Sequence, residues 1–475
     1  MRPAASPFTV RSAAALADAR LQQALADVPG GFVAARAKAK AGLPEFEALR
    51  RMGRDIKDHA LSHLDLYLEE FDRNATAAGS RVHWGGTASD ACDIILGICR
   101  AAGARLVTKS KSMVSEEIGL NARLEAAALE MVETDLGEYV IQIRGEVPSH
   151  LIAPAIHLGP ADIAEEFRRQ HDHLPPDRDM SSPAALVAEV RDILRPKFIG
   201  ADVGITGANF LVAKTGSAII VTNEGNGDLT LTLPRVHVVL ASIEKVVPTL
   251  DDAWTLLRLL ARSGTGQEFT AYTTLVTGPR RQHDPDGPEQ CHVVLVDNGR
   301  SELLGSGMRE VLRCIRCGAC MNHCPVYCSV GGHAYGSIYA GPIGAVLSPA
   351  LVGPQEAGEL AQASTFCGRC EQVCPVEIPL VKLMRQWREI SFGEGSAAGR
   401  SRALLRAWAF LARRPRLYHA AARTGTAFLR PFARGRGAFS SLPFAGAWTR
   451  YRDLPAPQGQ TFQAQWARRQ REDAE

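Results

Sequence analysis

Two short cysteine-rich runs hold the residues with the clearest capacity for chemistry. Residues 314–325 read CIRCGACMNHCP, which is the spacing C-x2-C-x2-C-x3-C-P of bacterial two-cluster ferredoxins. Residues 364–375 read STFCGRCEQVCP and repeat that spacing, with serine in place of the first cysteine. A zinc site uses four ligands per metal and does not need a second run in register. The two runs therefore predict an iron–sulfur module that carries electrons, and not a zinc site or a disulfide framework.

The crossed ligation of two-cluster ferredoxins divides these cysteines into two sets, because the fourth cysteine of each run ligates the other cluster. Cluster one is predicted to have four ligands, which are Cys314, Cys317, Cys320 and Cys374. Cluster two is then left with three cysteine ligands, which are Cys324, Cys367 and Cys370.

The fourth position of cluster two stays open at this point. Ser364 is in register with the missing cysteine, so its hydroxyl is the nearest candidate by spacing. Cys328, four residues beyond Cys324, is the competing candidate, and a water ligand or the loss of that iron is also consistent with the spacing. Oxygen holds iron less well than thiolate does here, so a serine ligand would make this corner labile. We expect two 4Fe-4S clusters, the second with an incomplete cysteine set.

Length and composition limit the classes of protein to consider. A chain of 475 residues is too long for a ferredoxin alone and predicts two or three domains. The net charge of +3 gives no indication of nucleic-acid binding, and we expect none. Seven of the eleven cysteines lie in the two runs, which favours a reducing compartment. With no run of about 18 uncharged apolar residues and no signal-peptide pattern, we expect a cytoplasmic protein.

The elements that must position the cysteines follow a helix–strand alternation. Residues 11–80 have helical apolar spacing, and a packing role for these helices is the simplest interpretation. Strands are predicted at 104–108, 139–143, 208–214, 217–223, 235–242, 270–277 and 291–297, with helices between several of them, including 122–133. Apolar, β-branched strands alternating with helices predict a layered, mostly parallel α/β domain.

Polar residues gather where predicted strands end, and ligands bind at the carboxyl ends of strands in such sheets. They are Lys109, Lys111, Asn223, Glu224 and Gly225. A solvated turn explains the 223–227 segment equally well. No G-x-G-x-x-G and no Walker A loop is present, so nicotinamide, flavin and ATP sites have no support. His150 and His157 are possible metal ligands, although lone histidines beside an apolar run are more often structural.

The composition changes again near the C-terminus. From residue 396 onward the sequence contains fifteen arginines, no lysine and four acidic residues, interleaved with aromatic residues. Basic amphipathic helices of this kind can lie on an anionic membrane or bind an acidic partner, and a helical cap is the alternative. We therefore divide the chain into N-terminal helices (1–80), an α/β domain (81–300), a dicluster module (301–395) and a basic C-terminal region (396–475).

With these residues in view, the sequence resembles the lactate utilisation protein B family over residues 55–475. The most specific stretches are 109–121, 215–227 and 314–344. The resemblance implies an α/β domain like those of the ribose-phosphate isomerase and CoA-transferase superfamily, followed by a helical dicluster module and a family-specific tail. It also implies that the protein acts with companion lactate-utilisation subunits in oxidising L-lactate to pyruvate, as an electron carrier whose acceptor the sequence does not identify.

Three other functions remain open. The protein could be a self-contained enzyme that acts on a small organic acid in the α/β domain, with Glu224 or a lysine taking part. It could be the electron-transfer subunit of a different 2-hydroxy-acid oxidase or of a disulfide-reductase-like complex. It could also be a binding module in which the clusters are structural. No catalytic residue is assigned, because fold-level analogy is weak grounds for activity.

Overall fold

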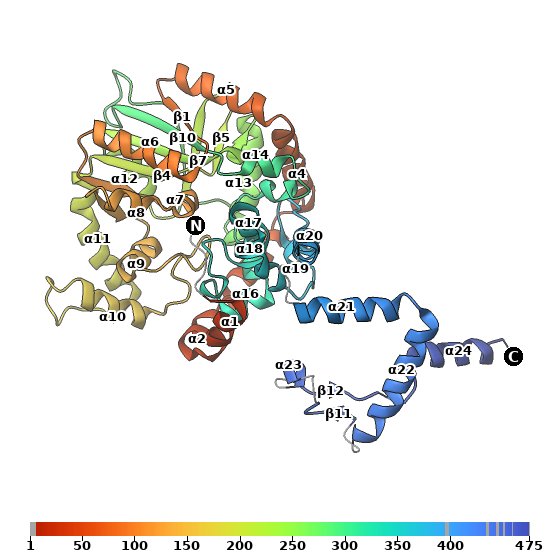
Figure 1. Ribbon diagram of the computed structural model, residues 1–475. Coiled ribbons are helices and arrows are strands. Elements are labelled where there is room, and N and C mark those ends of the chain that lie inside the picture. Colours follow the sequence, from red (N-terminus) through yellow and green to blue (C-terminus); the bar gives the residue numbers. More distant parts are fainter. Residues whose placement is uncertain are drawn as a thin grey trace. The chain divides into compact units, whose positions relative to one another are not determined.

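The computed structural model (Figure 1) describes residues 6–394, 399–433, 437–442, 446–449, 452–457 and 459–474. The chain forms two units, residues 1–391 and 392–475. The first unit contains both cysteine runs.

A six-stranded sheet forms the centre of the first unit, and every neighbouring pair of its strands is parallel. In spatial order the strands are β1 (Arg81–Gly85), β10 (Gln290–Val296), β7 (Val236–Ser242), β4 (Val203–Gly207), β2 (Leu106–Lys109) and β3 (Glu130–Glu133). Every residue of β7 is buried, as expected of a strand covered on both faces. The predicted mostly parallel α/β fold is confirmed.

Helices and a second sheet cover the two faces of this sheet. One face packs against α6 (Ala88–Ala101), α7 (Met113–Ile118) and α8 (Leu120–Glu125). The other face packs against α5 (Leu64–Ala77) and a four-stranded sheet. Beside β3, a separate apolar cluster joins α9 (Leu136–Arg144), α10 (Pro160–Gln170) and α11 (Pro183–Gly200).

The second sheet has the strand order β8 (Val246–Val247), β5 (Phe210–Val212), β6 (Ser217–Thr222) and β9 (Tyr272–Val276). The predicted turn between β5 and β6 is present, and Gly216 there has φ +65°. A Cβ at Gly216 would collide with the backbone of α5 at Ala75, so only glycine fits. The far face of this sheet packs against α13 (Leu250–Gly264) and the cysteine-bearing segments in one continuous core.

The part of the chain that contains the two cysteine runs, residues 300–393, folds mostly into short helices. They are α14 (Arg300–Leu304), η3 (Arg309–Arg313), α15 (Ala319–Asn322), α16 (Pro325–Val330), η4 (His333–Tyr335), α17 (Gly341–Val352), α18 (Pro354–Ala357), η5 (Gly358–Gln362), α19 (Arg369–Val373) and α20 (Leu380–Gly393). A further 3-10 turn, η2 (Ile243–Lys245), follows β7.

The N-terminal helices pack against this module and against α13. They are α1 (Phe8–Ala17), α2 (Ala19–Ala26), the π-helical turn η1 (Pro29–Val33), α3 (Ala34–Ala41) and α4 (Phe46–Ser62). Arg11 of α1 donates its Nε–H to the carbonyl of Ala334, and Phe8 lies 5.4 Å from the Tyr335 ring. Arg50 of α4 donates to the carbonyl of Cys374 at 2.6 Å. These helices therefore hold the loops on which the cysteines lie.

The second unit consists of α21 (Gly399–Ala412), α22 (Pro415–Leu429), η6 (Arg430–Ala433), α23 (Gly446–Thr449), α24 (Phe462–Glu472) and the two-residue strands β11 (Ala438–Phe439) and β12 (Leu454–Pro455). Large apolar side chains on its first two helices are exposed, including Leu404 at 73% and Trp408 at 61%. Among the residues that the structure describes, no helix is long and apolar enough to cross a membrane.

Two sequence predictions of secondary structure were wrong. The stretch 122–133 is not one helix, because α8 ends at Glu125 and β3 occupies Glu130–Glu133. The stretch 139–143 is helical within α9 and not a strand, since Asp135 caps the helix by accepting the Glu138 N–H. β1 and β4 were missed. β4 contains two glycines, and a Cβ at Gly204 would collide with the Thr230 carbonyl of α12 (Asn226–Thr232).

Candidate iron–sulfur site

The first cysteine run forms a tight loop between η3 and α15. Arg316 has φ +62° and Gly318 has φ +73°, so the chain reverses twice between Cys314 and Cys320. The reversal points the Arg316 amide at Cys314, to whose Sγ it donates a hydrogen bond at 3.4 Å. Amide hydrogen bonds to sulfur are one of the means by which proteins tune iron–sulfur clusters.

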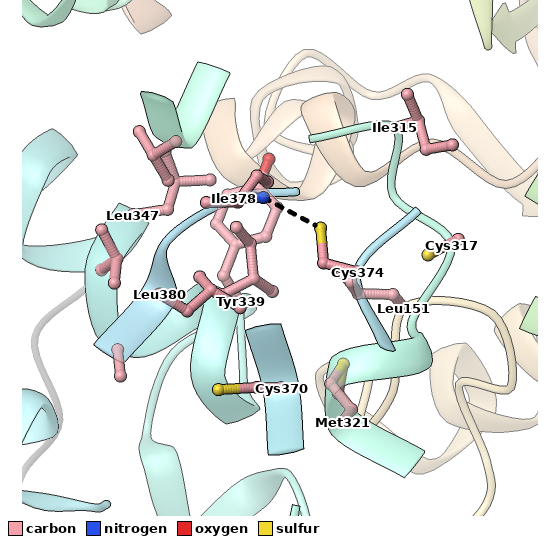
Figure 2. Packing of buried hydrophobic residues seen from close by; sticks show 14 of the residues in the cluster. Leu151, Ile315, Cys317, Met321, Tyr339, Leu347, Cys370, Cys374, Ile378 and Leu380 are labelled. Carbon is pink, nitrogen blue, oxygen red and sulfur yellow. Dashed lines mark hydrogen bonds between the residues drawn. The ribbon is translucent and has the colours of Figure 1, made fainter. Parts of the chain in front are cut away.

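The structure brings the four cysteines assigned to cluster one together. Burial, together with the nearby Cys374 and Cys314, raises the pKa of Cys317 to about 12. The pKa of Cys320 is raised well above its ordinary value by burial and then by Cys317, Cys314 and Cys374. Ile378 donates its N–H to Cys374 Sγ at 3.3 Å. Figure 2 shows this bond, with the Cys317 sulfur beside Cys374 in the packed core.

The three cysteines assigned to cluster two also gather. Burial raises the pKa of Cys370 to about 12, and Cys324 is the strongest of its charged neighbours. Cys367 contributes likewise to the raised pKa of Cys324. Cys367 itself is exposed, and the Arg369 amide that points at its sulfur lowers its pKa. This group lies nearer to solvent than the first.

The two candidates for the fourth position of cluster two have different surroundings. Ser364 is half-buried, and its Oγ accepts the Phe366 N–H at 3.1 Å. This bond has the same offset of two residues as the Arg316–Cys314 bond of the first run. Cys328 instead directs its thiol to the Asn322 carbonyl, with Sγ 3.4 Å from the oxygen. Ser364 therefore takes the place of the missing cysteine both in the sequence register and in the hydrogen bond that its side chain accepts from the backbone two residues on.

The donor atoms present fit two 4Fe-4S clusters. All eleven cysteines are free thiols, and seven of them lie in the two groups described above. Backbone amides point at the sulfurs in both groups, and such donors stabilise thiolates and clusters. Burial makes a free thiol hard to ionise. A bound metal takes the place of the thiol proton and supplies the compensating charge, so the same burial is compatible with a metal-bound thiolate and protects it from water.

A buried ionic network joins the first loop to the α/β domain. Arg300 lies with Nη2 2.6 Å from Glu117 Oε2 and with Nε 2.9 Å from Glu244 Oε2. Arg316 donates to Glu244 Oε1 at 3.2 Å, and its guanidinium lies 4.7 Å from the centre of the Tyr339 ring. Burial opposes the ionisation of Glu244, but Arg300 and Arg316 lower the pKa of this carboxyl to about 2.

The strand-end residues predicted from the sequence are separated by the structure. Lys111, Asn223 and Glu224 line a cavity of about 250 Å³ at the carboxyl ends of the strands. Lys109 does not line it, because its ammonium is fully buried 2.7 Å from Glu133 and donates to Ser115. Gly225, at φ +65°, begins α12. The cavity also reaches Lys245, whose pKa is lowered to about 7 by burial.

The two histidines raised as possible metal ligands lie apart from the cavity lining and differ from each other. His150 accepts the N–H groups of Ile152 and Ala153, and its other nitrogen lies 2.9 Å from Asn322 Oδ1, so it is structural. His157 lies with Nε2 2.8 Å from Glu146 Oε2. Glu146, His157 and His333 offer three ligand atoms within 4.8 Å of one another, a set that could hold a divalent ion.

Sequence reasoning did not find the Glu117–Arg300–Glu244–Arg316 network. Its members come from four distant segments, and no spacing rule joins them. The one available signal was composition, since acidic and arginine residues stand beside otherwise apolar strand and loop segments. Only the fold reveals that they meet beneath the first cysteine loop.

A parallel α/β domain joined through a shared core to a two-run cysteine module defines an iron–sulfur protein class. Residues 68–296 match the LUD domain family, residues 310–378 match the 4Fe-4S dicluster domain family, and residues 385–471 match the family of lactate utilisation protein B C-terminal regions. The chain belongs to the lactate utilization protein B family.

Relatives match over almost the whole length. The chain is 41% identical to Lactate utilization protein B of Shouchella clausii, over 99% of this chain and 98% of that one. It is 40% identical to the protein of the same name from Lysinibacillus sphaericus, over 100% and 99% of the two chains. A crystal structure of a DUF162 family protein from Deinococcus radiodurans aligns with 49% of this chain and 98% of its own, at 12% identity and a TM-score of 0.28.

Proposed function

We propose that this protein is the iron–sulfur electron carrier of a multi-protein system that oxidises L-lactate to pyruvate. The observation that carries the proposal is the gathering of seven thiols into two groups, each drawing cysteines from both runs. The names of the relatives support lactate as the substrate of the system. The designation "B" in those names supports companion subunits that supply the other activities.

The proposed ligands follow the two groups. Cluster one is held by Cys314, Cys317, Cys320 and Cys374, and cluster two by Cys324, Cys367 and Cys370, with the Ser364 hydroxyl at the remaining corner. When bound, the clusters accept and release single electrons. The protein holds the thiolates in place, points backbone amides at them and buries Cys317 and Cys374 of the first group.

The two sites have different access to solvent, which supports a direction of transfer. Cys317 of the first group lines the cavity of the α/β domain, whereas Cys367 of the second group is exposed. With clusters bound, the first group would be the side nearer the electron donor, and an acceptor would dock near Cys367. In this proposal the domains are the N-terminal helices (1–80), the α/β domain (81–300), the dicluster module (301–395) and the basic C-terminal region (396–475). The proposed compartment is the reducing cytoplasm.

The basic C-terminal region is proposed to contact an anionic membrane surface. Residues 399–429 contain seven arginines and no acidic residue. Trp408 and Phe410 on α21 are more than half exposed, as side chains that enter a lipid interface would be. Sedimentation with anionic vesicles, weakening as salt rises and lost in a Trp408→Ser, Phe410→Ser variant, tests this contact. Salt-independent sedimentation, or none, contradicts it.

Anaerobic purification tests the central proposal. Iron and acid-labile sulfide should each approach about eight per chain if both clusters are cubanes. The cluster absorbance should bleach when L-lactate and the companion proteins are added, and should not bleach when the companions are left out. Stoichiometric zinc without sulfide would remove the iron–sulfur assignment, and clusters that lactate and the companions cannot reduce would remove the lactate-linked function.

A further inference from the structure

The cavity at the carboxyl ends of the strands carries a surplus of positive charge next to the first cysteine loop. Its walls include three cationic side chains, Lys111, Lys245 and Arg316, together with the backbone segment of Cys317. Lys111 follows β2, Lys245 follows β7, and Arg316 belongs to the cysteine loop. Two modules of the molecule thus contribute to one cavity, at the edge where α/β sheets bind ligands.

The cations of this cavity keep hydrogen-bonding capacity that the described residues do not use. Among those residues the ammonium groups of Lys111 and Lys245 donate no hydrogen bond, although Lys245 is only 6% exposed. Nearby carboxylates stabilise both charges without such a bond, Asp135 acting on Lys111 and Glu244 on Lys245. Arg316 uses Nη2 for Glu244, while its buried Nη1 has no hydrogen-bond acceptor among the described residues. A buried ammonium beside an unpaired guanidinium N–H is costly unless an anion completes the site.

The two carboxylates of the cavity, Asp135 and Glu224, act on Lys111 and also accept backbone N–H groups. Asp135 accepts the Glu138 N–H at the N-terminus of α9, and Glu224 accepts the Leu136 N–H at 3.5 Å. Both carboxylates therefore face the start of a helix, where backbone N–H groups stabilise negative charge. The cavity therefore leaves two ammonium groups and one guanidinium N–H without a hydrogen-bond acceptor among the described residues, which suits it to a ligand with anionic oxygens.

We propose that this cavity binds a small monocarboxylate with an oxygen on its second carbon, that is, a 2-hydroxy or 2-oxo acid. Lys245 and the free Arg316 Nη1 hold its carboxylate, and Lys111 contacts the second oxygen. The volume of about 250 Å³ lies below the roughly 300–1,000 Å³ of pockets for drug-sized ligands, which excludes a dinucleotide. The 2-hydroxy and 2-oxo classes rest on the proposed function, whereas the carboxylate itself rests on the cavity.

Anion binding here would couple the α/β domain to the first cluster loop. Arg316 and Cys317 form part of the wall. Gly264 of α13 packs so closely on the Cys317 carbonyl that a Cβ at position 264 would lie 2.8 Å from the carbonyl oxygen. A ligand that pulls on Arg316 therefore acts on the loop that carries Cys314 and Cys317. Occupancy should be visible in the spectrum of cluster one.

Calorimetric titration of the anaerobically purified, cluster-containing protein tests the site. L-lactate, pyruvate and inorganic phosphate are the probes. L-lactate or pyruvate should bind, and Lys245→Gln and Lys111→Gln should each weaken binding by about tenfold or more, since each removes one charge-assisted hydrogen bond. Lys38→Gln, a change at an exposed lysine outside the cavity, should leave binding unchanged. Pyruvate should also shift the electron paramagnetic resonance signal of the reduced wild type, and not that of Lys245→Gln.

The outcomes separate this site from the proposed function. A variant is used only if its cluster absorbance and circular dichroism match those of the wild type. If only one of Lys245→Gln and Lys111→Gln meets this condition, the binding affinity of that variant tests the site. Binding that neither variant weakens, binding of phosphate alone, or no binding overturns the site. If pyruvate binds through Lys245 but lactate and the companion proteins never reduce the clusters, the proposed function fails and the site stands.

Discussion

The loops that begin the two cysteine runs have nearly the same backbone and opposite surroundings. Arg316 and Phe366 occupy matching positions with φ of +62° and +54°, and Gly318 and Gly368 match with φ of +73° and +78°. Positive φ is uncommon in arginine and phenylalanine, so its recurrence reports a shared loop geometry and not a chance turn. The sequence change at the first position, cysteine to serine, therefore leaves the loop intact.

The side chains that leave these loops differ in what they touch. Arg316 enters the buried ionic network at Glu244, which ties the first loop to the α/β domain. Phe366 is 37% exposed and lies under the guanidinium of Arg388, at 3.9 Å from its ring centre. One loop is thus built into the core and the other faces solvent. The comparison teaches that the residues packed over a loop, and not the loop's backbone conformation, decide whether its cysteines are buried or face solvent.

The largest expected effect comes from removing one thiol of each group. Cys320→Ala should remove about half of the iron, because this thiol lies among those of Cys317, Cys314 and Cys374 and alanine offers no ligand atom. Cys367→Ala, at an exposed position, should keep cluster one and lose only the second cluster. Iron per chain measures the loss in each variant, and paramagnetic resonance shows which cluster survives. Equal spectra of the surviving cluster in both variants would mean that the cysteines do not form two groups.

The next effect concerns the network that covers the first loop. Glu244→Gln leaves Arg300 and Arg316 buried without their shared carboxylate, so unfolding should become easier by about 3–5 kcal/mol. Chemical denaturation under anaerobic conditions measures it. The matched control is Glu310→Gln, which breaks a partly exposed ion pair with Lys382 and should cost less than about 1 kcal/mol. If the two variants lost the same unfolding free energy, the buried network would not be what distinguishes the first loop from the second.

Much of this arrangement was predictable from the sequence, for identifiable reasons. Cysteine spacing is set by cluster geometry, so the two runs and their crossed assignment are readable one residue at a time. The strands β7 and β10 are long and apolar, so the parallel sheet was predictable too. Strand β4 was not, because its Gly204 is required by a contact with Thr230 of α12 that only the fold creates.

The parts that sequence could not supply depend on long-range contacts. Glu117, Arg300 and Glu244 become a network only when α7, α14 and η2 meet, and nothing in their spacing indicates this. The same holds for the cavity, since Lys111 was expected at a strand end but its neighbours Lys245 and Arg316 come from other segments. The helix α9 was misread because its Tyr-Val-Ile run has high strand propensity, which the Asp135 cap and packing overrode.

A smaller effect is expected at the serine that distinguishes the second loop. Ser364→Cys should lengthen the lifetime of cluster two in air, on the order of several-fold, because thiolate holds iron better than a hydroxyl oxygen does. Loss of cluster absorbance in aerated buffer measures it. Cys328→Ala is the control and should change little, since the Cys328 thiol bonds to the Asn322 carbonyl. Conversion to a three-iron signal in Cys328→Ala alone would move the fourth ligand to Cys328.

The smallest expected effect tests the cover of the second loop. Arg388 donates from Nε to the Ala361 carbonyl at 2.8 Å and from Nη2 to the Ser364 carbonyl at 3.1 Å, while stacking on Phe366. Because the group is partly exposed, Arg388→Ala should ease local opening of residues 361–367 by only about 1 kcal/mol. Hydrogen exchange at these amides should therefore accelerate by about fivefold, with the amides of residues 314–320 unchanged. Arg385→Ala, which removes only an exposed pair with Glu389, should leave both loops alone. If exchange accelerated equally in the two loops, they would open as one unit, and the contrast between an internal and an outward-facing cluster position would not extend to their dynamics.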